Sequence, residues 1–261
     1  MTTASPRIGI VTGASAGIGL AIARHLSAAG CKLVINARRA DRLDALAREL
    51  GASTVIPVAG DSADESVIAR MLDTPRDRFG READLIVINA GRGLGGTAIT
   101  SDAAQWDDML RTNFIAVSRL IRAAGPRLLA MVPQDQLGHT GSWTQHPRDI
   151  IILGSIVGRH VSPFSSFYSA TKAAVQSLAE GTRRELGPKG IRVTLVEPAF
   201  VTSEFQAVAG YADAWYQQMV EKFGPMLTPD DIARAITFIA QQPAHVHISD
   251  IVIRPTRQEY P

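Results

Sequence analysis

The stretch Arg7-Ile-Gly-Ile-Val-Thr-Gly-Ala-Ser-Ala-Gly-Ile-Gly19 decides the fold, because it joins a short apolar run to a glycine-rich turn and a helical pattern. Arg7 to Val11 predicts a buried strand, and the pattern after Gly19 predicts a helix to about Ala29. Gly13 permits a tight turn, while Gly17 and Gly19 allow a phosphate backbone to approach. The helix N-terminus then offers free N–H groups to a pyrophosphate. The stretch therefore predicts the first strand-turn-helix unit of a dinucleotide-binding domain.

The second predicted strand, Cys31 to Ile35, ends without an acidic residue. The chain continues Asn36-Ala-Arg-Arg39, which places two guanidinium groups where a carboxylate would hold the ribose 2′-hydroxyl of NAD. A guanidinium presents a planar fork of donors that matches phosphate oxygens, and Ser15 in the glycine turn can add a hydroxyl. Arg38 and Arg39 therefore favour NADP(H) as the cofactor. The alternative is that both arginines are solvated and begin the next helix.

Apolar runs and helical patterns alternate along the rest of the chain. Further strands are predicted within Ser53–Val58, Asp84–Gly91, Ile150–Leu153, Ile191–Val196 and Ile248–Ile253. Helices are predicted for Asp41–Leu50, Ala63–Phe79, Ala103–Met131, Tyr168 to about Gly187, Ser203–Phe223 and Ile232–Gln241. Gly125-Pro126 predicts an irregularity in the long helix, and Thr228 with Asp231 predicts a capping box before the last one. The alternation indicates an α/β fold, a single-domain Rossmann-type doubly wound parallel sheet of about seven strands with helices on both faces.

The length of 261 residues allows one large domain or two small ones, and the lack of a repeat or linker-like break in the sequence favours one domain over residues 1–261. Apolar residues make up 46% of the chain and charged residues 20%, which suffices for a sizeable core. The net charge of +2 gives no support for nucleic-acid binding. The single Cys31 excludes an internal disulfide and suits a reducing compartment. Met1 to Pro6 lacks the apolar core of a signal peptide, and no run approaches the roughly 18 apolar residues of a membrane span, so we expect a cytoplasmic protein without a membrane partner.

A second stretch, Ser155 to Lys172, carries the side chains expected to do chemistry. It follows the buried run Ile150 to Leu153, so Ser155 lies at the end of a strand. Tyr168 and Lys172 are four residues apart and share one face of a helix. An ammonium beside a phenol favours the phenolate and lowers the phenol pKa from about 10 toward the working pH. A phenol, an ammonium and a hydroxyl that converge can polarise a carbonyl and give it a proton.

Together these motifs resemble the short-chain dehydrogenase/reductase family. The matching residues follow the family's order over nearly the whole chain: Thr12-Gly-x-x-x-Gly-x-Gly19, Asn89-Ala-Gly91, Asn113, Ser155 and Tyr168-x-x-x-Lys172. The C-terminal third resembles the branch of 3-hydroxy acid (serine) dehydrogenases and clavulanate-type aldehyde reductases. Two positions depart from the family, because Ala116 and Ala199 stand where relatives usually have glycine.

The resemblance implies roles for individual residues. Four residues are implied to be catalytic: Tyr168 as proton donor or acceptor, Lys172 as the cation that lowers the pKa of Tyr168, Ser155 as holder of the substrate oxygen and Asn113 as support of a water relay. Asn113 is also implied to kink the long helix. The residues implied to bind the cofactor are Gly13, Ser15, Gly17, Ile18, Gly19, Arg38, Arg39, Asp61, Ser62, Asn89, Ala90, Gly91, Tyr168, Lys172, Pro198, Val201 and Thr202.

Several of these residues have an expected place in the ligand crevice. By resemblance, Asp61 lies near the adenine amino group, and Val201 and Thr202 lie near the nicotinamide carboxamide. Arg92 follows the fourth strand, where it either meets a substrate anion or is solvated, and we favour the solvated alternative. Ser203 to Phe223 is amphipathic and rich in aromatic residues, so we expect a substrate lid that also packs as an ordinary helix.

Residues 133–148 are expected to form an inserted surface loop. Relatives pass from the long helix to the fifth strand in a few residues, whereas sixteen intervene here. His139 and His146 raise the possibility of a metal site, but the loop leads to the amino end of the fifth strand, opposite the ligand edge. We therefore favour a surface hairpin or a subunit contact and expect no metal.

The expected function is NADP-dependent interconversion of a carbonyl and an alcohol by hydride transfer. The substrate would be a small ketone or aldehyde, or one of a 3-hydroxy acid/3-oxo acid pair, and the resemblance implies a homo-tetramer or homo-dimer. One alternative is a non-catalytic dinucleotide sensor, but such proteins typically lose the Tyr or Lys that this chain keeps. Another is a 3-oxoacyl thioester reductase, which predicts a basic entrance for a carrier phosphopantetheine, whereas Ser203 to Phe223 is aromatic.

Overall fold

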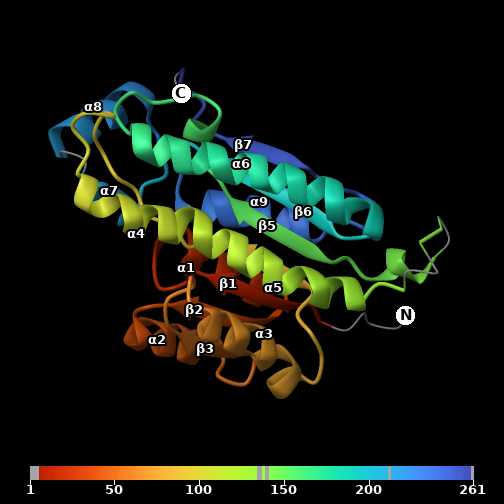
Figure 1. The fold of residues 1–261 in the computed structure, drawn as a ribbon. Coiled ribbons are helices and arrows are strands. Elements are labelled where there is room, and N and C mark those ends of the chain that lie inside the picture. The colour runs from red at the N-terminus through yellow and green to blue at the C-terminus, as the bar shows by residue number, and fades with distance from the viewer. Residues whose placement is uncertain (1–5, 134–136, 139–140, 211–212, 260–261) are drawn as a thin grey trace.

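The computed structural model describes residues 6–133, 137–138, 141–210 and 213–259, and these residues form one central parallel sheet of seven strands (Figure 1). The strand order is β3-β2-β1-β4-β5-β6-β7, so the direction of winding reverses between β1 and β4. The strands are β1 (Ile8–Thr12), β2 (Lys32–Ala37), β3 (Val55–Ala59), β4 (Leu85–Ile88), β5 (Asp149–Leu153), β6 (Arg192–Pro198) and β7 (Asp250–Ile253). This arrangement confirms the predicted α/β fold with a doubly wound sheet.

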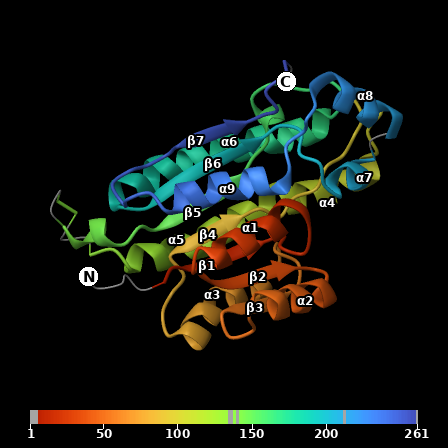
Figure 2. The same ribbon diagram turned by 180° about the vertical axis from the view of Figure 1, so that it is seen from behind.

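Helices cover both faces of the sheet because its strands are apolar on both sides. In β1, Ile8 and Ile10 pack into one core and Val11 into the other. One face is covered by α1 (Gly17–Ala28), α2 (Ala40–Leu50) and α9 (Pro229–Ala240), the opposite face by α3 (Glu65–Phe79), α5 (Ala116–Ala130) and α6 (Ser166–Leu186). Figure 1 shows α5 and α6 in front of the sheet, and Figure 2 shows α1 and α9 on its reverse side.

The long predicted helix departs from α geometry around Asn113, where the resemblance implies a kink, and not at Gly125-Pro126. A short 3₁₀ turn (Ala103–Gln105) and α4 (Trp106–Leu110) lead into a π-helical turn at Arg111–Ile115, and α5 follows. Gly125-Pro126 lies inside α5, so the irregularity predicted there is wrong. Pro126 has no N–H to donate to the Arg122 carbonyl one turn earlier. Both residues are exposed, so water can bond this carbonyl instead. The π-helical turn instead surrounds Asn113, which is buried.

The segment between β6 and α9 forms an excursion over the carboxyl end of the sheet. It contains two helices, α7 (Phe205–Ala209) and α8 (Asp213–Phe223), rather than one continuous helix. Its ends meet, since the Thr202 N–H donates to the Leu227 carbonyl at 2.9 Å and the Leu227 N–H donates to the Phe200 carbonyl at 3.2 Å. We call residues 202–226 the lid. Tyr211, one of its predicted aromatic residues, lies outside the described residues.

A cluster of ion pairs joins the strands at the opposite, amino edge of the sheet. Arg7 donates to Asp84 at 2.8 Å and to Asp149 at 2.7 Å. Arg192 donates to both oxygens of Asp149, at 2.6 and 2.8 Å, and also to the carbonyls of Gln242, Pro243 and Val246. The cluster therefore fixes the starts of β1, β4, β5 and β6 relative to the segment after α9.

The described part of the 133–148 segment leads into the amino end of β5, as its position in the sequence predicts (Figure 1). Leu137 and Trp143 pack against the core beneath α5 and α6, and a Cβ placed on Gly190 would lie 3.3 Å from Leu137 and 3.5 Å from Trp143. His139 lies outside the described residues and His146 is exposed. Across 6–133, 137–138, 141–210 and 213–259, no three or more His, Cys, Asp or Glu side chains gather as a metal site, and no helix is long and apolar enough to cross a membrane.

Candidate active site

Two adjoining cavities lie at the carboxyl edge of the sheet, and we call the two together the groove. Their volumes are about 890 and 370 Å³, and both are lined by Ile18, Asn89, Ser203 and Phe205. The groove lies where the strand order reverses, between β1 and β4, which is where open α/β sheets bind their ligands. We call the larger cavity the substrate cavity and the smaller one the adenosine cavity, after the ligands that each would accommodate.

The glycine-rich turn after β1 forms the floor of the groove. Gly13 has a φ of +69°, and a Cβ placed there would lie 2.8 Å from the Asn89 side-chain nitrogen. A Cβ on Gly19 would lie 2.5 Å from the same nitrogen. The Thr12 hydroxyl accepts the N–H groups of Asn89 and Ala90, each at 3.0 Å. Glycine is therefore required for the tight fit of the turn against the β4 loop, and the cradle that results is open to a pyrophosphate.

Cations gather at the adenosine end of the groove. The end of β2 carries no carboxylate, and Asn36 is buried with its amide donating to the Val58 carbonyl at 2.8 Å. Arg38 is exposed and lines the adenosine cavity, while Arg39 donates to the Ser15 hydroxyl at 3.0 Å. Two guanidinium groups and a hydroxyl at one site fit a 2′-phosphate, so this end of the groove fits NADP.

A carboxylate that was not predicted from the sequence lies beside these arginines. Glu204 of the lid accepts from Arg39 at 3.1 Å and from Arg42 at 2.8 Å. Hydrogen bonds from Arg42 and Arg39 lower the pKa of the Glu204 carboxyl. No local pattern signals these pairs, because more than 160 residues separate Glu204 from both arginines.

Asp61 lies at the end of β3 and lines the same cavity. Its carboxylate accepts the Ala63 N–H at 2.8 Å and the Arg111 guanidinium at 3.1 Å. Partial burial alone would raise the pKa of the Asp61 carboxyl, but the Ala63 N–H, Arg111 and Arg38 outweigh that effect and lower it. Asp61 is therefore an anion in the lining of the smaller cavity, which it shares with Arg38.

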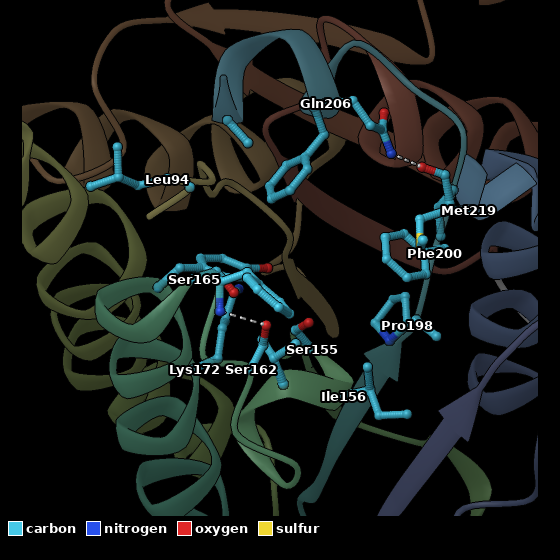
Figure 3. A pocket seen from close by; sticks show the side chains of 18 of the residues that line it. Leu94, Ser155, Ile156, Ser162, Ser165, Lys172, Pro198, Phe200, Gln206 and Met219 are labelled. Carbon is cyan, nitrogen blue, oxygen red and sulfur yellow. Dashed lines mark hydrogen bonds between the residues drawn. The ribbon is translucent and has the colours of Figure 1, made fainter. Parts of the chain in front are cut away.

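The substrate cavity contains the three side chains predicted to do chemistry. Ser155, Tyr168 and Lys172 all line it, and each is more than nine-tenths buried. The Lys172 ammonium donates to the Leu153 carbonyl at 2.8 Å and lies 5.9 Å from the centroid of the Tyr168 ring. Burial lowers the pKa of Lys172 from its ordinary 10.5 to about 8. Figure 3 shows Ser155 and Lys172 on one side of this cavity, with Leu94 and Gln206 across it.

Asn113 is fully buried behind the groove and lines neither cavity. Its side-chain oxygen accepts the Arg92 N–H at 2.9 Å, and its side-chain nitrogen donates to the Arg92 carbonyl at 2.9 Å and to the Thr171 hydroxyl at 3.1 Å. These bonds join the π-helical turn to the β4 loop and to the helix that carries Tyr168 and Lys172.

The predicted cofactor residues divide between the two cavities. The substrate cavity is lined by Ile18, Asn89, Tyr168, Lys172, Pro198 and Val201, and the adenosine cavity by Gly13, Ser15, Gly17, Ile18, Gly19, Arg38, Arg39, Asp61, Ser62, Asn89, Ala90 and Gly91. Thr202 lines neither cavity, and its hydroxyl lies 2.8 Å from that of Tyr216 in the lid. Arg92 is not solvated as expected, since it is half-buried and bonded to Asp108 and Gln105.

Comparisons with known proteins agree with this geometry. The sequence model of the short chain dehydrogenase family matches residues 7–212. The human dehydrogenase/reductase SDR family member 11 is 35% identical over 265 residues, which cover 97% of this chain and 95% of that protein. A serine dehydrogenase solved in a closed form with NADP⁺ is 30% identical with a TM-score of 0.82, over 97% of this chain and 96% of that one. An L-sorbose reductase of Gluconobacter frateurii, solved with NADPH and L-sorbose, is 25% identical with a TM-score of 0.80, over 98% and 97%.

Proposed function

Because this chain belongs to the short-chain dehydrogenase/reductase family, we propose that it is an NADP-dependent oxidoreductase that interconverts a carbonyl and an alcohol. The observation that carries the proposal is that Ser155, Tyr168 and Lys172 line one cavity, which adjoins the glycine cradle. The bound nicotinamide would supply or accept the hydride. The protein's own side chains hold the substrate oxygen and move its proton.

Tyr168 is the proton donor in reduction and the acceptor in oxidation. The Lys172 ammonium beside it favours the phenolate by Coulomb attraction, and burial strengthens that attraction because little water screens it. With a pKa near 8, Lys172 is charged at neutral pH and loses that charge in mildly alkaline solution. Ser155 donates a hydrogen bond to the substrate oxygen and so orients the carbonyl toward Tyr168.

Asn113 acts on these groups indirectly. Its side chain fixes the β4 loop and Thr171, one residue before Lys172, so it positions the lysine rather than contacting the substrate. A π-helical turn inserts an extra residue into the helix and thereby frees a backbone carbonyl from its usual donor. Such a carbonyl suits the proposed water relay that returns a proton toward Lys172.

The residues proposed to bind the cofactor fit a dinucleotide that carries a 2′-phosphate. Gly13, Gly17 and Gly19 hold the pyrophosphate, and Arg38, Arg39 and Ser15 hold the 2′-phosphate. The relatives solved with NADP⁺ and with NADPH support this cofactor. Asp61, Ser62, Asn89, Ala90 and Gly91 line the adenosine and ribose part, and Pro198 and Val201 line the nicotinamide end.

A cytoplasmic location and a homo-dimer or homo-tetramer complete the proposal, supported by the single buried cysteine and by the family. The 133–148 segment is proposed as an inserted surface loop or subunit contact within the single domain.

Replacement of Tyr168 by phenylalanine tests the catalytic assignment. Tyr168→Phe should lower kcat at least about a hundredfold, the lower end of general acid-base effects, with little change in NADPH affinity. NADPH oxidation with a panel of aldehydes and ketones gives kcat, and fluorescence titration gives the affinity. A protein that binds NADPH but turns over no carbonyl would instead be a dinucleotide sensor, and an active Phe variant would contradict the role of Tyr168.

A further inference from the structure

The walls of the substrate cavity are mainly aromatic and aliphatic. Phe205 lies 5.7 Å from the Tyr168 ring, centroid to centroid, and Phe200 lies 5.9 Å from Trp215 and 6.3 Å from Phe223. Leu94, Val157, Phe164 and Met219 add further apolar surface. Figure 3 shows Leu94, Phe200 and Met219 around the space beyond Ser155. Flat ring faces on the lid side suit a substrate that carries a ring of its own.

The charges around this cavity offer no partner for a substrate carboxylate. Among the described residues, those with charged side chains that line it are Asp102, Lys172 and Lys222. Lys172 is bonded to the Leu153 carbonyl, and Lys222 lies at the half-exposed rim in an ion pair with Glu259. A carboxylate that enters would lose its hydration without gaining an unengaged cation, and Asp102 would repel it.

Three polar side chains of the wall, Gln206, Gln105 and Thr100, are engaged with the protein itself. Gln206 accepts the Ser203 N–H at 3.0 Å and donates to the Val201 carbonyl at 2.6 Å. Gln105 donates to Asp102 at 2.9 Å, and the Thr100 hydroxyl lies 3.1 Å from that of Thr97. A polyhydroxylated substrate would have to break these bonds in order to use these three side chains. The Gln258 amide nitrogen also belongs to the lining, and among the described residues it is buried without a hydrogen-bond partner, so it offers one donor.

The geometry points to an uncharged, ring-bearing ketone or aldehyde, mostly apolar beyond its carbonyl, as the substrate of this site. The inference rests on the proposed carbonyl chemistry and specifies its substrate class. A cavity of about 890 Å³ is within the range that holds drug-sized ligands, even though the nicotinamide end of the cofactor shares it. A small charged hydroxy acid would leave most of the apolar wall without contact.

A matched pair of aryl ketones tests this substrate class. Methyl 4-acetylbenzoate and 4-acetylbenzoate share the same reacting carbonyl and ring and differ in one negative charge. We expect kcat/KM for the ester to exceed that for the acid by about a hundredfold or more, since a buried carboxylate without a partner is costly. Quenching of tryptophan fluorescence by the ester but not by the acid gives a binding readout, because Trp215 lines the cavity.

A variant that adds a cation provides the converse test. Met219→Lys should raise the acid-to-ester ratio of kcat/KM at least about tenfold, and the neutral Met219→Gln should not. An acid reduced as well as its ester by the wild type would overturn the inference, as would an unchanged ratio in Met219→Lys. Failure of the underlying proposal looks different, because then neither ketone supports NADPH oxidation.

A second inference concerns the lid and the cofactor arginines. Ser203 and Phe205 line both cavities, so the start of the lid crosses the middle of the groove. Glu204 between them accepts from Arg42 and from one guanidinium nitrogen of Arg39, and Arg39 also bonds Ser15. This carboxylate therefore occupies one of the donors that a 2′-phosphate would use. We propose that Glu204 competes with the 2′-phosphate for Arg39, so that NADP binding releases this end of the lid.

Direct coenzyme titration tests the competition, given the proposed use of NADP. Glu204→Gln removes a half-exposed carboxylate, so we expect the Kd for NADPH to fall about three- to tenfold and that for NADH to stay unchanged. Glu221→Gln is the matched control, because it removes a negative charge from an exposed position on α8. Equal changes for both coenzymes, no change, or weaker NADPH binding would each overturn the competition. A wild type without NADPH preference would instead contradict the proposed cofactor.

Discussion

At Lys172, chemistry requires a charge that folding disfavours. Burial lowers the lysine pKa from 10.5 to about 8, which means that the folded protein binds this proton less well than the unfolded chain does. Below about pH 8 the charge is present in both states, so the folded state bears the full cost. Between pH 8 and 10.5 the unfolded chain binds more protons, and stability from this group rises with pH.

Lys172→Met should therefore stabilise the protein while it abolishes activity. We expect the free energy of unfolding at neutral pH to rise by about 1–3 kcal/mol. The substitution also removes the hydrogen bond from Lys172 to the Leu153 carbonyl, and this loss makes the gain smaller than it would otherwise be. The gain should shrink toward pH 10.5, where the wild-type lysine is neutral in the folded state. Urea unfolding at both pH values measures it. A variant less stable than the wild type at neutral pH would mean that the lost hydrogen bond outweighs the removed charge.

At the scale of secondary-structure elements, the π-helical turn ties three parts of the site together through Asn113. Asn113→Ala leaves the Arg92 N–H and carbonyl without their buried partners. We expect a loss of about 2–4 kcal/mol in the free energy of unfolding and a lower kcat, with NADPH affinity largely retained. Ser118→Ala is the control, because the hydrogen bond recorded for its hydroxyl goes to the Phe114 carbonyl of the adjoining π-helical turn and not to the β4 loop or to α6. Equal stability of the two variants would contradict the positioning role of Asn113.

Local patterns predicted the elements better than the contacts between them. The capping box at Thr228 and Asp231 was predicted and is confirmed, because both partners lie within one helical turn. The departure from α geometry near Asn113 was expected from the family resemblance and not from a local pattern. The local signal of Gly125-Pro126 was misleading, because a proline on an exposed helix face costs less than its sequence signal suggests. The pairing of Glu204 with Arg42 spans 162 residues and depends on how the lid folds back. Burial of Lys172 likewise follows from tertiary packing that no short motif encodes.

At the scale of the whole molecule, the two edges of the sheet have different roles, one in stability and the other in ligand binding. The amino edge holds the ion-pair cluster of Arg7, Asp84, Asp149 and Arg192, and the carboxyl edge holds the groove. Arg7→Met leaves Asp84 without its closest cation and removes one of two cations from Asp149. We expect a loss of about 3–5 kcal/mol in the free energy of unfolding, with kcat at low temperature unchanged.

Denaturant titration and steady-state kinetics on the same preparations separate the two effects. Asp84→Leu added to Arg7→Met should recover part of the lost stability, because it removes the carboxylate that the first change leaves buried. A large loss of kcat in a fully folded Arg7→Met protein would show that the two edges of the sheet are coupled.

The meeting of the lid's two ends at Thr202 and Leu227 has a consequence for protein engineering. A segment whose anchor points are adjacent can be exchanged as a cassette, since its replacement needs to match only the short gap between them. The graft would carry Glu204 and the lid's share of the aromatic wall together, and so would alter the proposed competition for Arg39 and the substrate preference in one step. The recipient sheet, with its glycine cradle and its Tyr168 helix, would be left as it was.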